Sequence, residues 1–396
     1  MSGIFRKYNR CGAWSIAAFA AGSLAFLVSC VPGEAQIEIN RQVIPGSTPP
    51  IWVSMSGFTG LAAQVIEFDL YVQGFGFTNA ENAQYLISGS NTGDLQGRAV
   101  DRVNKSPLVS KVYTGATPRR QAHAFTDDFV QALGQKGIAQ TKIAFNVGGA
   151  NSEIYVADFD GANPQAVTMD KTLVAAPCWA PGRLALFYSS YKLGNPAIFF
   201  HDLSTGTRKT IAWYGGSNLS PAVSPDGKRV AMILSKDGWT DLYVGDAGGG
   251  NVKRLTKSRE DESSPCWSPD GQWICFAAKI NERRAICKIA ATGGSPQRIP
   301  TPGFSNPTEP DWSPDGKWIA FTSQGGGFQI CVVPSQGGQV TGLVAGEDPS
   351  WSRNSRTLVF FRRSTGHLSL LDVPTKQVKD VARVSSGENS QPSWAR

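Results

Sequence analysis

Side chains that could catalyse a reaction or hold a metal are few and scattered in this chain of 396 residues. Only three histidines occur, His123, His201 and His367, and none has a second ligand at metal-binding spacing. The chain has no Gly-x-Ser-x-Gly, His-Glu-x-x-His or phosphate-loop motif. The acidic segment 158–161 is too short for a calcium loop, and a turn explains it better. We therefore expect no catalytic centre, no metal site and no cofactor.

The seven cysteines also give little sign of redox or metal chemistry. Cys11 and Cys30 fall in the N-terminal segment, and no Cys-x-x-Cys motif occurs. The other five are an odd number and cannot all pair. We expect them to be small, buried apolar residues, at positions Cys178, Cys266, Cys275, Cys287 and Cys331.

A repeat defines the elements that must position all these side chains. The segment Pro-Cys-Trp-Ser-Pro-Asp-Gly at 265–271 has related copies that begin at Pro177, Pro221, Pro310, Pro349 and Pro392. Successive copies are 44, 44, 45, 39 and 43 residues apart. A period of this length, with short strands inside each unit, is typical of a β-propeller.

Each repeat predicts one propeller blade of four strands. In the unit that begins at Pro221, apolar runs at 230–233 and 242–244 follow the Pro-Asp-Gly turn, and a further strand is expected at 252–256. The last copy has no blade of its own, so we expect the C-terminal strand to complete the blade begun at 142–170. This gives an all-β six-bladed propeller closed by the C-terminal strand, with the repeat tryptophans packed between blades.

Residues 36–141 have a different pattern and predict an N-terminal α/β domain, followed by the propeller at 142–396. Strands are expected at 51–55, 83–88, 98–103 and 108–113, and a helix from Leu61 towards Val72. A second helix has Thr117 as its cap, Pro118 at its first position and Gly134 as its stop.

The first 35 residues resemble a cleavable export signal. Basic Arg6, Lys7 and Arg10 precede an apolar run at 13–31, and small residues at 33–35 offer a cleavage site. The alternative is a lipoprotein anchored at Cys30, which ends the lipobox-like segment 27–30. Both interpretations predict an exported protein.

The formal charge is +7, and removal of the signal with Arg6, Lys7, Arg10 and Glu34 leaves +5. This excess is small for the chain's length, and no block of Lys or Arg exceeds two residues. Nucleic-acid binding is therefore disfavoured.

The segment that joins the two domains resembles the TolB family, the periplasmic component of the Tol–Pal system. It carries Arg120, the pair Ala122-His123 and Asp127 in the second helix, followed by Lys-Gly-Ile-Ala-Gln-Thr-Lys-Ile-Ala-Phe at 136–145. The resemblance implies a non-enzymatic monomer of the periplasm, with Arg120, His123 and Asp127 at the domain junction. It also implies that one propeller face binds the peptidoglycan-associated lipoprotein Pal, and that the N-terminal region contacts inner-membrane Tol proteins. The family role is outer-membrane integrity and constriction at cell division.

The family's Pal-binding positions lie just before the Pro-x-Trp segments and match Ser217, Ser220 and Ser263 here. The neighbouring acidic residues are expected to ring the same channel mouth: Asp261, Glu262, Glu309 and Asp348. The alternative is a propeller enzyme or saccharide-binding protein of the envelope that acts in the central channel.

Overall fold

The structure is a computed structural model that describes residues 45–382 and 387–396. The predicted export segment 1–35, with the lipobox-like residues before Cys30, lies outside the described part. Within the described part, no helix is both long and apolar enough to span a bilayer.

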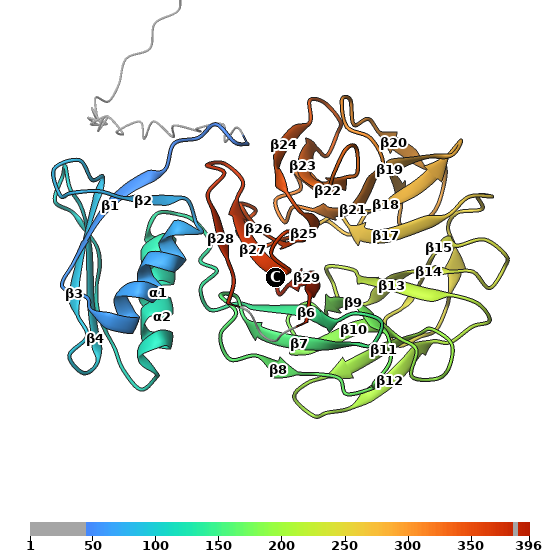
Figure 1. Ribbon diagram of the computed structural model, residues 1–396, viewed down its shortest axis with the longest axis horizontal. Helices are drawn as coiled ribbons and strands as arrows, with labels where there is room; N and C mark the ends of the chain where they lie inside the picture. The colour runs from blue at the N-terminus through green and yellow to red at the C-terminus, as the bar shows by residue number, and fades with distance from the viewer. Residues whose placement is uncertain (1–44, 383–386) are drawn as a thin grey trace, which may run out of the picture. The chain divides into compact units, whose positions relative to one another are not determined.

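The N-terminal α/β region is a five-stranded sheet with two helices (Figure 1). Its sheet order is β2-β1-β3-β4-β5, with β1 parallel to both of its neighbours and the remaining pairs antiparallel. The elements are β1 (Ile51–Ser56), α1 (Gly60–Tyr71), β2 (Phe75–Phe77), β3 (Tyr85–Ser90), β4 (Leu95–Asp101), β5 (Pro107–Tyr113) and α2 (Pro118–Ala132). Both predicted helices are confirmed, whereas the three-residue strand β2 was not predicted.

Helix α2 begins as its sequence indicates. Thr117 Oγ1 accepts the backbone N–H of Arg120 at 3.3 Å, and Pro118 occupies the first turn, where no N–H partner is needed. Phe125 and Phe129 are buried in the core that the helix forms with the sheet. On its other face α2 contacts the propeller, and these contacts form part of the junction between the two regions.

The propeller consists of six antiparallel four-stranded sheets. Blade 1 contains β6 (Lys142–Gly148), β7 (Ser152–Asp158), β8 (Gln165–Ala166) and the C-terminal β29 (Asn389–Trp394). Blade 2 contains β9 (Val174–Trp179), β10 (Ala185–Ser190), β11 (Ala197–Asp202) and β12 (Arg208–Ala212). Blade 3 contains β13 (Asn218–Val223), β14 (Arg229–Leu234), β15 (Asp241–Asp246) and β16 (Lys253–Arg254).

Blade 4 contains β17 (Glu262–Trp267), β18 (Trp273–Ile280), β19 (Arg283–Ala290) and β20 (Gln297–Ile299). Blade 5 contains β21 (Pro307–Trp312), β22 (Trp318–Ser323), β23 (Gln329–Pro334) and β24 (Thr341–Ala345). Blade 6 contains β25 (Glu347–Trp351), β26 (Thr357–Arg362), β27 (His367–Asp372) and β28 (Val378–Asp380). The predicted closure is confirmed, because β29 pairs with β6 through Ser393 opposite Ala144 and Trp394 opposite Ile143.

The repeat tryptophans are buried between blades, as predicted. Trp179, Trp267 and Trp351 each donate the indole N–H to a backbone carbonyl in the preceding blade's inner strand, at 2.9–3.1 Å. The partners are the residues that follow the first proline of the repeat segment in the preceding blade: Ser393, Ala222 and Asp311. These three tryptophans therefore link neighbouring blades by a hydrogen bond as well as by packing, whereas Trp312 donates to the Gly316 carbonyl and Trp394 to Thr141 Oγ1.

The two propeller faces carry different connections. All inner strands begin at what we call the start face, which therefore also carries the hairpins between second and third strands. In blades 1 to 4 this face includes the segments 149–151, 167–173, 191–196, 213–217, 235–240, 255–261 and 279–284. The inner strands end at the opposite end face, which carries the Ser-Pro-Asp-Gly turns. In those turns Ser224 and Ser268 donate to Asp226 and Asp270.

Four of the described cysteines are buried and Cys178 is half-buried, and all five are free thiols. This agrees with their predicted role as small core residues.

Candidate binding site at the propeller channel

A ring of six strained residues surrounds the channel. Each is the residue directly before the first proline of a repeat segment, which is Pro-x-Trp in five blades and Pro-Ala-Val in blade 3. None is glycine, yet all have φ near +50°. They are Ala176 (52°), Ser220 (50°), Ser264 (51°), Glu309 (53°), Asp348 (55°) and Gln391 (48°). Left-handed backbone at non-glycine residues costs energy and persists only where surrounding structure enforces it.

A bulge in every inner strand enforces this conformation. In β17, for example, the register with β18 shifts between Ser263 and Cys266, so Ser264 and Pro265 have no partner in the ladder. The same shift occurs in the other five inner strands. A bulge re-aims the backbone groups of the extra residues, and here it turns them towards neighbouring blades.

A chain of hydrogen bonds connects part of this ring from blade to blade. Glu309 Oε2 accepts the N–H of Asp348 at 3.1 Å, and Asp348 Oδ2 accepts the N–H of Gln391 at 3.1 Å. Gln391 Oε1 in turn accepts the N–H of Ala176 at 2.9 Å and the amide of Asn146 at 2.8 Å. Each side chain thus satisfies the re-aimed N–H of the next blade.

The two carboxyl groups in this chain sit in a poorly solvated place. Burial raises the pKa of Glu309. Burial also raises the pKa of Asp348, and the nearby Glu309 raises it further. Their oxygens already accept backbone hydrogen bonds, so the pair acts as a structural link in the channel wall.

Above the ring, towards the end face, the channel widens into a cavity of about 780 Å³. Its wall repeats equivalent positions from blade to blade, with the prolines and tryptophans of the repeat segments and the prolines of the following turns prominent among them. Arg183, Arg353 and Arg396 are its cationic lining residues besides Lys142. The cavity wall therefore combines apolar rings with charged side chains, because Glu309, Asp311 and Asp348 also line it.

Of the predicted partner-binding residues, Ser220, Glu309 and Asp348 belong to the ring itself, whereas Ser217, Asp261, Glu262 and Ser263 lie on its start-face side. Ser217 ends the connection into β13, and its N–H donates to Ser235 Oγ at 2.7 Å. Asp261 is exposed and accepts a hydrogen bond from Thr240 Oγ1 at 2.8 Å. Ser220 and Ser263 are half-buried in their inner strands, so the structure brings these four residues together on blades 3 and 4.

Glu262 differs from its neighbours because its side chain is buried. It accepts the backbone N–H of Leu242 at 2.9 Å and the hydroxyl of Thr256. Burial raises its pKa to about 7. Its contacts hold the start of β17 against β15, which positions Asp261 and Ser263 on either side of it.

Sequence reasoning did not single out Ala176, Ser264 and Gln391, which complete the ring. The signal was available, since all six members occupy the same position relative to the repeated proline. The sequence prediction was based on side-chain chemistry and therefore selected the serines and the acidic residues. The property that all six ring residues share is a backbone conformation.

The junction between the α/β region and the propeller contains a buried polar cluster. His123 of α2 has Nδ1 at 2.7 Å from Asp69 Oδ2 in α1 and Nε2 at 3.2 Å from Asp160 Oδ2 in the turn after β7. Arg119 pairs with the same Asp160 oxygen. Burial alone would lower the pKa of His123, but its hydrogen bonds to Asp160 and Asp69 raise it to about 9. Burial raises the pKa of Asp69 to about 7.

The three residues Asp69, His123 and Asp160 are close enough to be considered as a metal site. Their arrangement fits a protonated histidine better. Nδ1 faces Asp69 and Nε2 faces Asp160. A metal ion bound to one of these nitrogens would therefore lie beside only one of the two carboxylates. Arg119 already supplies a positive charge to Asp160.

The other two predicted junction residues have separate roles. Asp127 is buried and accepts the backbone N–H groups of Ala139 at 2.8 Å and Gln140 at 3.2 Å, which fixes the connection into blade 1. Arg120 is exposed on α2, and Arg119 makes the contact with the propeller instead.

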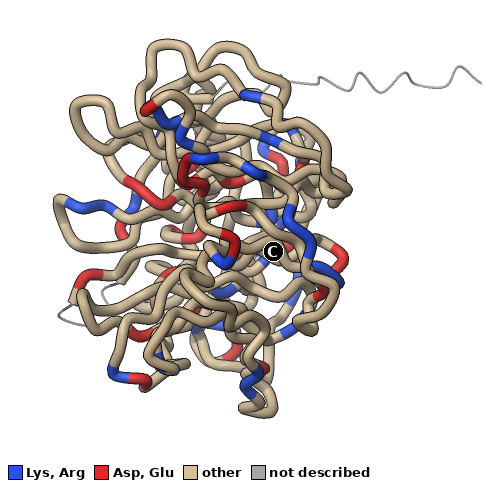
Figure 2. Tube along the Cα trace, turned by 90° about the vertical axis from the view of Figure 1, so that its right-hand side faces the viewer, with Lys and Arg blue, Asp and Glu red and all other residues tan. Residues whose placement is uncertain are grey.

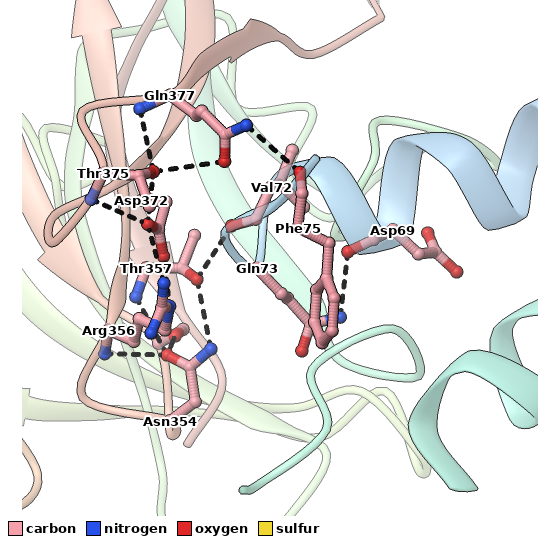
Figure 3. A network of polar contacts seen from close by, with 11 residues as sticks. Asp69, Val72, Gln73, Phe75, Asn354, Arg356, Thr357, Asp372, Thr375 and Gln377 are labelled. Atoms are coloured by element: carbon pink, nitrogen blue, oxygen red, sulfur yellow. Dashed lines mark hydrogen bonds and ion pairs between the residues drawn. The ribbon is translucent and has the colours of Figure 1, made fainter. Parts of the chain in front are cut away.

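A second set of contacts links the end of α1 to blade 6 (Figure 3). Thr357 Oγ1 donates to the carbonyl of Val72 at 3.1 Å, and Gln377 Nε2 donates to the carbonyl of Phe75 at 3.1 Å (Figure 3). Between them, Gly74 has φ +86°, and a Cβ there would meet the Arg356 guanidinium. A glycine is required for this close approach.

Comparison with known proteins agrees with this architecture. The family profile described as TolB beta propeller domain matches residues 129–396. Proteins named Tol-Pal system protein TolB from Bordetella parapertussis and Bordetella pertussis are 31% identical over 330 residues, which is 80% of this chain and 75% of theirs. The crystal structure of TolB from Acinetobacter baumannii superposes with a TM-score of 0.78 at 24% identity, over 89% of this chain and 98% of that one. A nidogen/laminin complex chain shares the propeller fold alone, with a TM-score of 0.57 at 11% identity.

The fold therefore defines a class of two-part proteins. In this class a closed six-bladed propeller follows a small α/β region and is joined to it by a buried ionic cluster. Within that class, the profile match and the curated relatives make the family clear: this chain belongs to the TolB family.

Proposed function

We propose that the protein is a non-enzymatic periplasmic scaffold of the Tol–Pal system. In this proposal the start face binds the peptidoglycan-associated lipoprotein Pal, and the N-terminal region contacts inner-membrane Tol proteins. The complex would support outer-membrane integrity and constriction during division. The mature chain would begin at Gln36, after removal of the export signal. The curated relatives carry the Tol-Pal system name, which supports this assignment.

The observation that carries the proposal is the strained ring with its neighbouring start-face residues. Six left-handed residues, held by bulges and by hydrogen bonds from blade to blade, make the channel mouth rigid. A rigid mouth loses little conformational entropy when a folded partner docks. Ser217, Ser220, Asp261 and Ser263 lie together there and would contact Pal directly.

The alternative of an enzyme or saccharide-binding protein acting in the channel finds less support. The carboxyl groups of Glu309 and Asp348 each accept a backbone N–H, and prolines and tryptophans form much of the cavity wall beyond them. Catalysis by paired carboxyls needs oxygens free to reach a substrate.

The test is calorimetric binding of the exported chain to the soluble domain of Pal from the same organism. Ser263→Trp places a bulky ring at the start face and is expected to weaken binding at least tenfold. Ser204→Trp is the matched control, because Ser204 is exposed in the turn after β11 on the end face. Absence of Pal binding by the parent chain, or equal losses in both variants, would refute the proposed site.

A further inference from the structure

Exposed apolar side chains are concentrated on the start face of four adjacent blades. We call this set the crescent, and it consists of Met169, Leu173, Leu193, Trp213, Trp239 and Ile280. Met169 is 81% exposed, Trp213 57% and Trp239 51%. Among the described propeller residues, the other strongly exposed large apolar side chain is Leu184, on the end face. Scattered single apolar residues are normal on a surface, but their confinement to one face is informative.

The crescent follows the order of the blades. Met169 and Leu173 lie in the connection from blade 1 to blade 2, and Leu193 lies in the hairpin of blade 2. Trp213 follows β12, and Trp239 lies in the neighbouring hairpin between β14 and β15. Ile280 ends β18 in blade 4. The anchors therefore run along one arc beside the channel mouth.

The two tryptophans stand on loops that are held in place. The residue after Trp213, Tyr214, exchanges two hydrogen bonds with the buried side chain of Asn218, at 2.9 and 2.8 Å. Lys236 bridges the two loops, with Nζ 4.6 Å from the Tyr214 ring centre and 5.2 Å from that of Tyr243.

The hairpin that carries Trp239 is fixed at both ends. Tyr243 Oη donates to Asp237 Oδ2 at 2.6 Å, and Thr240 Oγ1 donates to Asp261 Oδ1 at 2.8 Å. Exposed aromatic rings on a pre-organised support are the typical composition of binding hot spots.

The charges around the crescent favour an acidic partner. Basic residues outnumber acidic ones in the start-face segments of blades 1 to 4: Lys171, Lys192, Lys236, Lys257, Arg259, Lys279, Arg283 and Arg284 against Asp170, Asp237, Glu260, Asp261 and Glu282. Along the trace as a whole, Lys and Arg are interspersed with Asp and Glu (Figure 2). Lys257 and Arg259 are exposed beside the crescent, in the connection from blade 3 to blade 4.

We propose that the crescent anchors a folded protein partner with an acidic, apolar-bearing surface, and that Trp213 and Trp239 supply most of the affinity. This inference rests on the proposed function and deepens it. It assigns most of the binding free energy to residues that lie farther from the channel than the channel-mouth serines. The serines then determine how the partner fits over the channel mouth, while the tryptophan side chains insert into the surface of the partner.

The mixture of side chains favours a protein over a glycan. A sugar ring stacks on flat aromatic faces, and the two tryptophans alone could serve that purpose. Met169, Leu193 and Ile280 extend the same arc with flexible or branched aliphatic groups, which match the pockets of a protein surface.

The test measures binding of the soluble domain of Pal to the exported chain and its variants. Trp213→Ala and Trp239→Ala are each expected to lower the affinity at least tenfold and the double variant at least a hundredfold, mainly through faster dissociation. Leu184→Ala is the matched control and should change the affinity less than twofold. Unchanged thermal unfolding would show that the exposed rings were removed without damage to the fold.

A charge variant gives an independent readout. Lys257→Glu with Arg259→Glu should slow association several-fold at low salt, and the difference should shrink at high salt. Lys317→Glu, in an end-face turn with its side chain 75% exposed, should leave association unchanged.

The outcomes separate the two proposals. Pal binding by the parent chain with unchanged affinity in both tryptophan variants overturns the crescent and leaves the proposed function standing. No Pal binding by the parent chain overturns both. Sedimentation with purified peptidoglycan sacculi that is lost in the tryptophan variants, while Pal binding persists, would assign the crescent to a glycan and overturn the protein partner.

Discussion

The indole N–H of Trp267 donates to the backbone carbonyl of Ala222 at 2.9 Å, across the boundary between blades 4 and 3. Trp179 and Trp351 make the same bond one blade back, so the contact recurs at three of the five repeat tryptophans. The contact buries a large aromatic ring. It also gives a hydrogen-bond donor to a carbonyl group that the bulged strand leaves available.

Trp267→Phe should therefore destabilise the propeller by about 2 kcal/mol, since it removes one hydrogen bond and leaves a small cavity. Urea unfolding followed by tryptophan fluorescence and circular dichroism measures the loss. The same substitution at the exposed Trp239 is the control and should change the free energy of unfolding by less than about 0.5 kcal/mol. Equal effects at the two sites would show that the interblade bond contributes little.

The sequence was sufficient for the architecture because the repeat encodes one local unit many times. Proline, aspartate and glycine specify the turns, and the spare Pro392-Ser-Trp394 has no blade to join except the first. The strand β2 was missed because Phe75-Gly-Phe77 is too short to show a period. Its pairing with β1 depends on tertiary context.

The site was less predictable, for two physical reasons. A residue before proline is expected in extended backbone, so the left-handed ring contradicts local preference and arises only when bulged strands pack around a channel. His123 was assigned to the junction, but its partners Asp69 and Asp160 are 54 and 37 residues away in sequence. Only the folded chain brings their carboxylates to the ring.

The junction cluster predicts a pH dependence of stability. Hydrogen bonds to Asp160 and Asp69 raise the pKa of His123 from 6.5 to about 9 in the folded chain. The resulting stabilisation is fully present below pH 6.5 and is lost as the pH rises through about 9, with an upper size of about 3 kcal/mol. The raised pKa of Asp69 acts in the same direction, but at lower pH, between 3.8 and about 7.

Urea unfolding at pH 6.5 and pH 9.5 tests this dependence. The parent chain should lose stability between the two values, and His123→Gln should be less stable at pH 6.5 and show little further loss. The control His201→Gln should keep the parent slope, because burial lowers the pKa of His201. A His123→Gln variant with the full parent slope would show that another group causes it.

The C-terminal residue contributes to ring closure. Arg396 donates to the carbonyls of Trp351 at 3.1 Å and Trp312 at 3.3 Å, and it pairs with Asp311. Arg396→Ala should cost about 2 kcal/mol, because hydrogen bonds that involve a charged group are stronger than neutral ones. Arg183→Ala removes a more exposed pair with Asp202 and should destabilise the chain clearly less than Arg396→Ala does. Thermal melts of both variants decide whether the tail side chain locks the blades together.

Because the ring residues are strained, we expect a glycine substitution in the ring to raise the free energy of unfolding. Ala176 has φ +52°, and its side chain is a methyl group that makes no hydrogen bond, so the strain can be tested there without loss of a polar contact. Ala176→Gly relieves a left-handed strain of about 1–2 kcal/mol but adds freedom to the unfolded chain, which takes back about half of it. The variant should be about 0.5–1 kcal/mol more stable than the parent. Ala175→Gly, one residue earlier in the paired part of β9, gains no such relief and should be destabilised by a similar amount. Opposite signs at adjacent positions in urea unfolding would show that the ring stores backbone strain, and equal destabilisation of both variants would show that it does not.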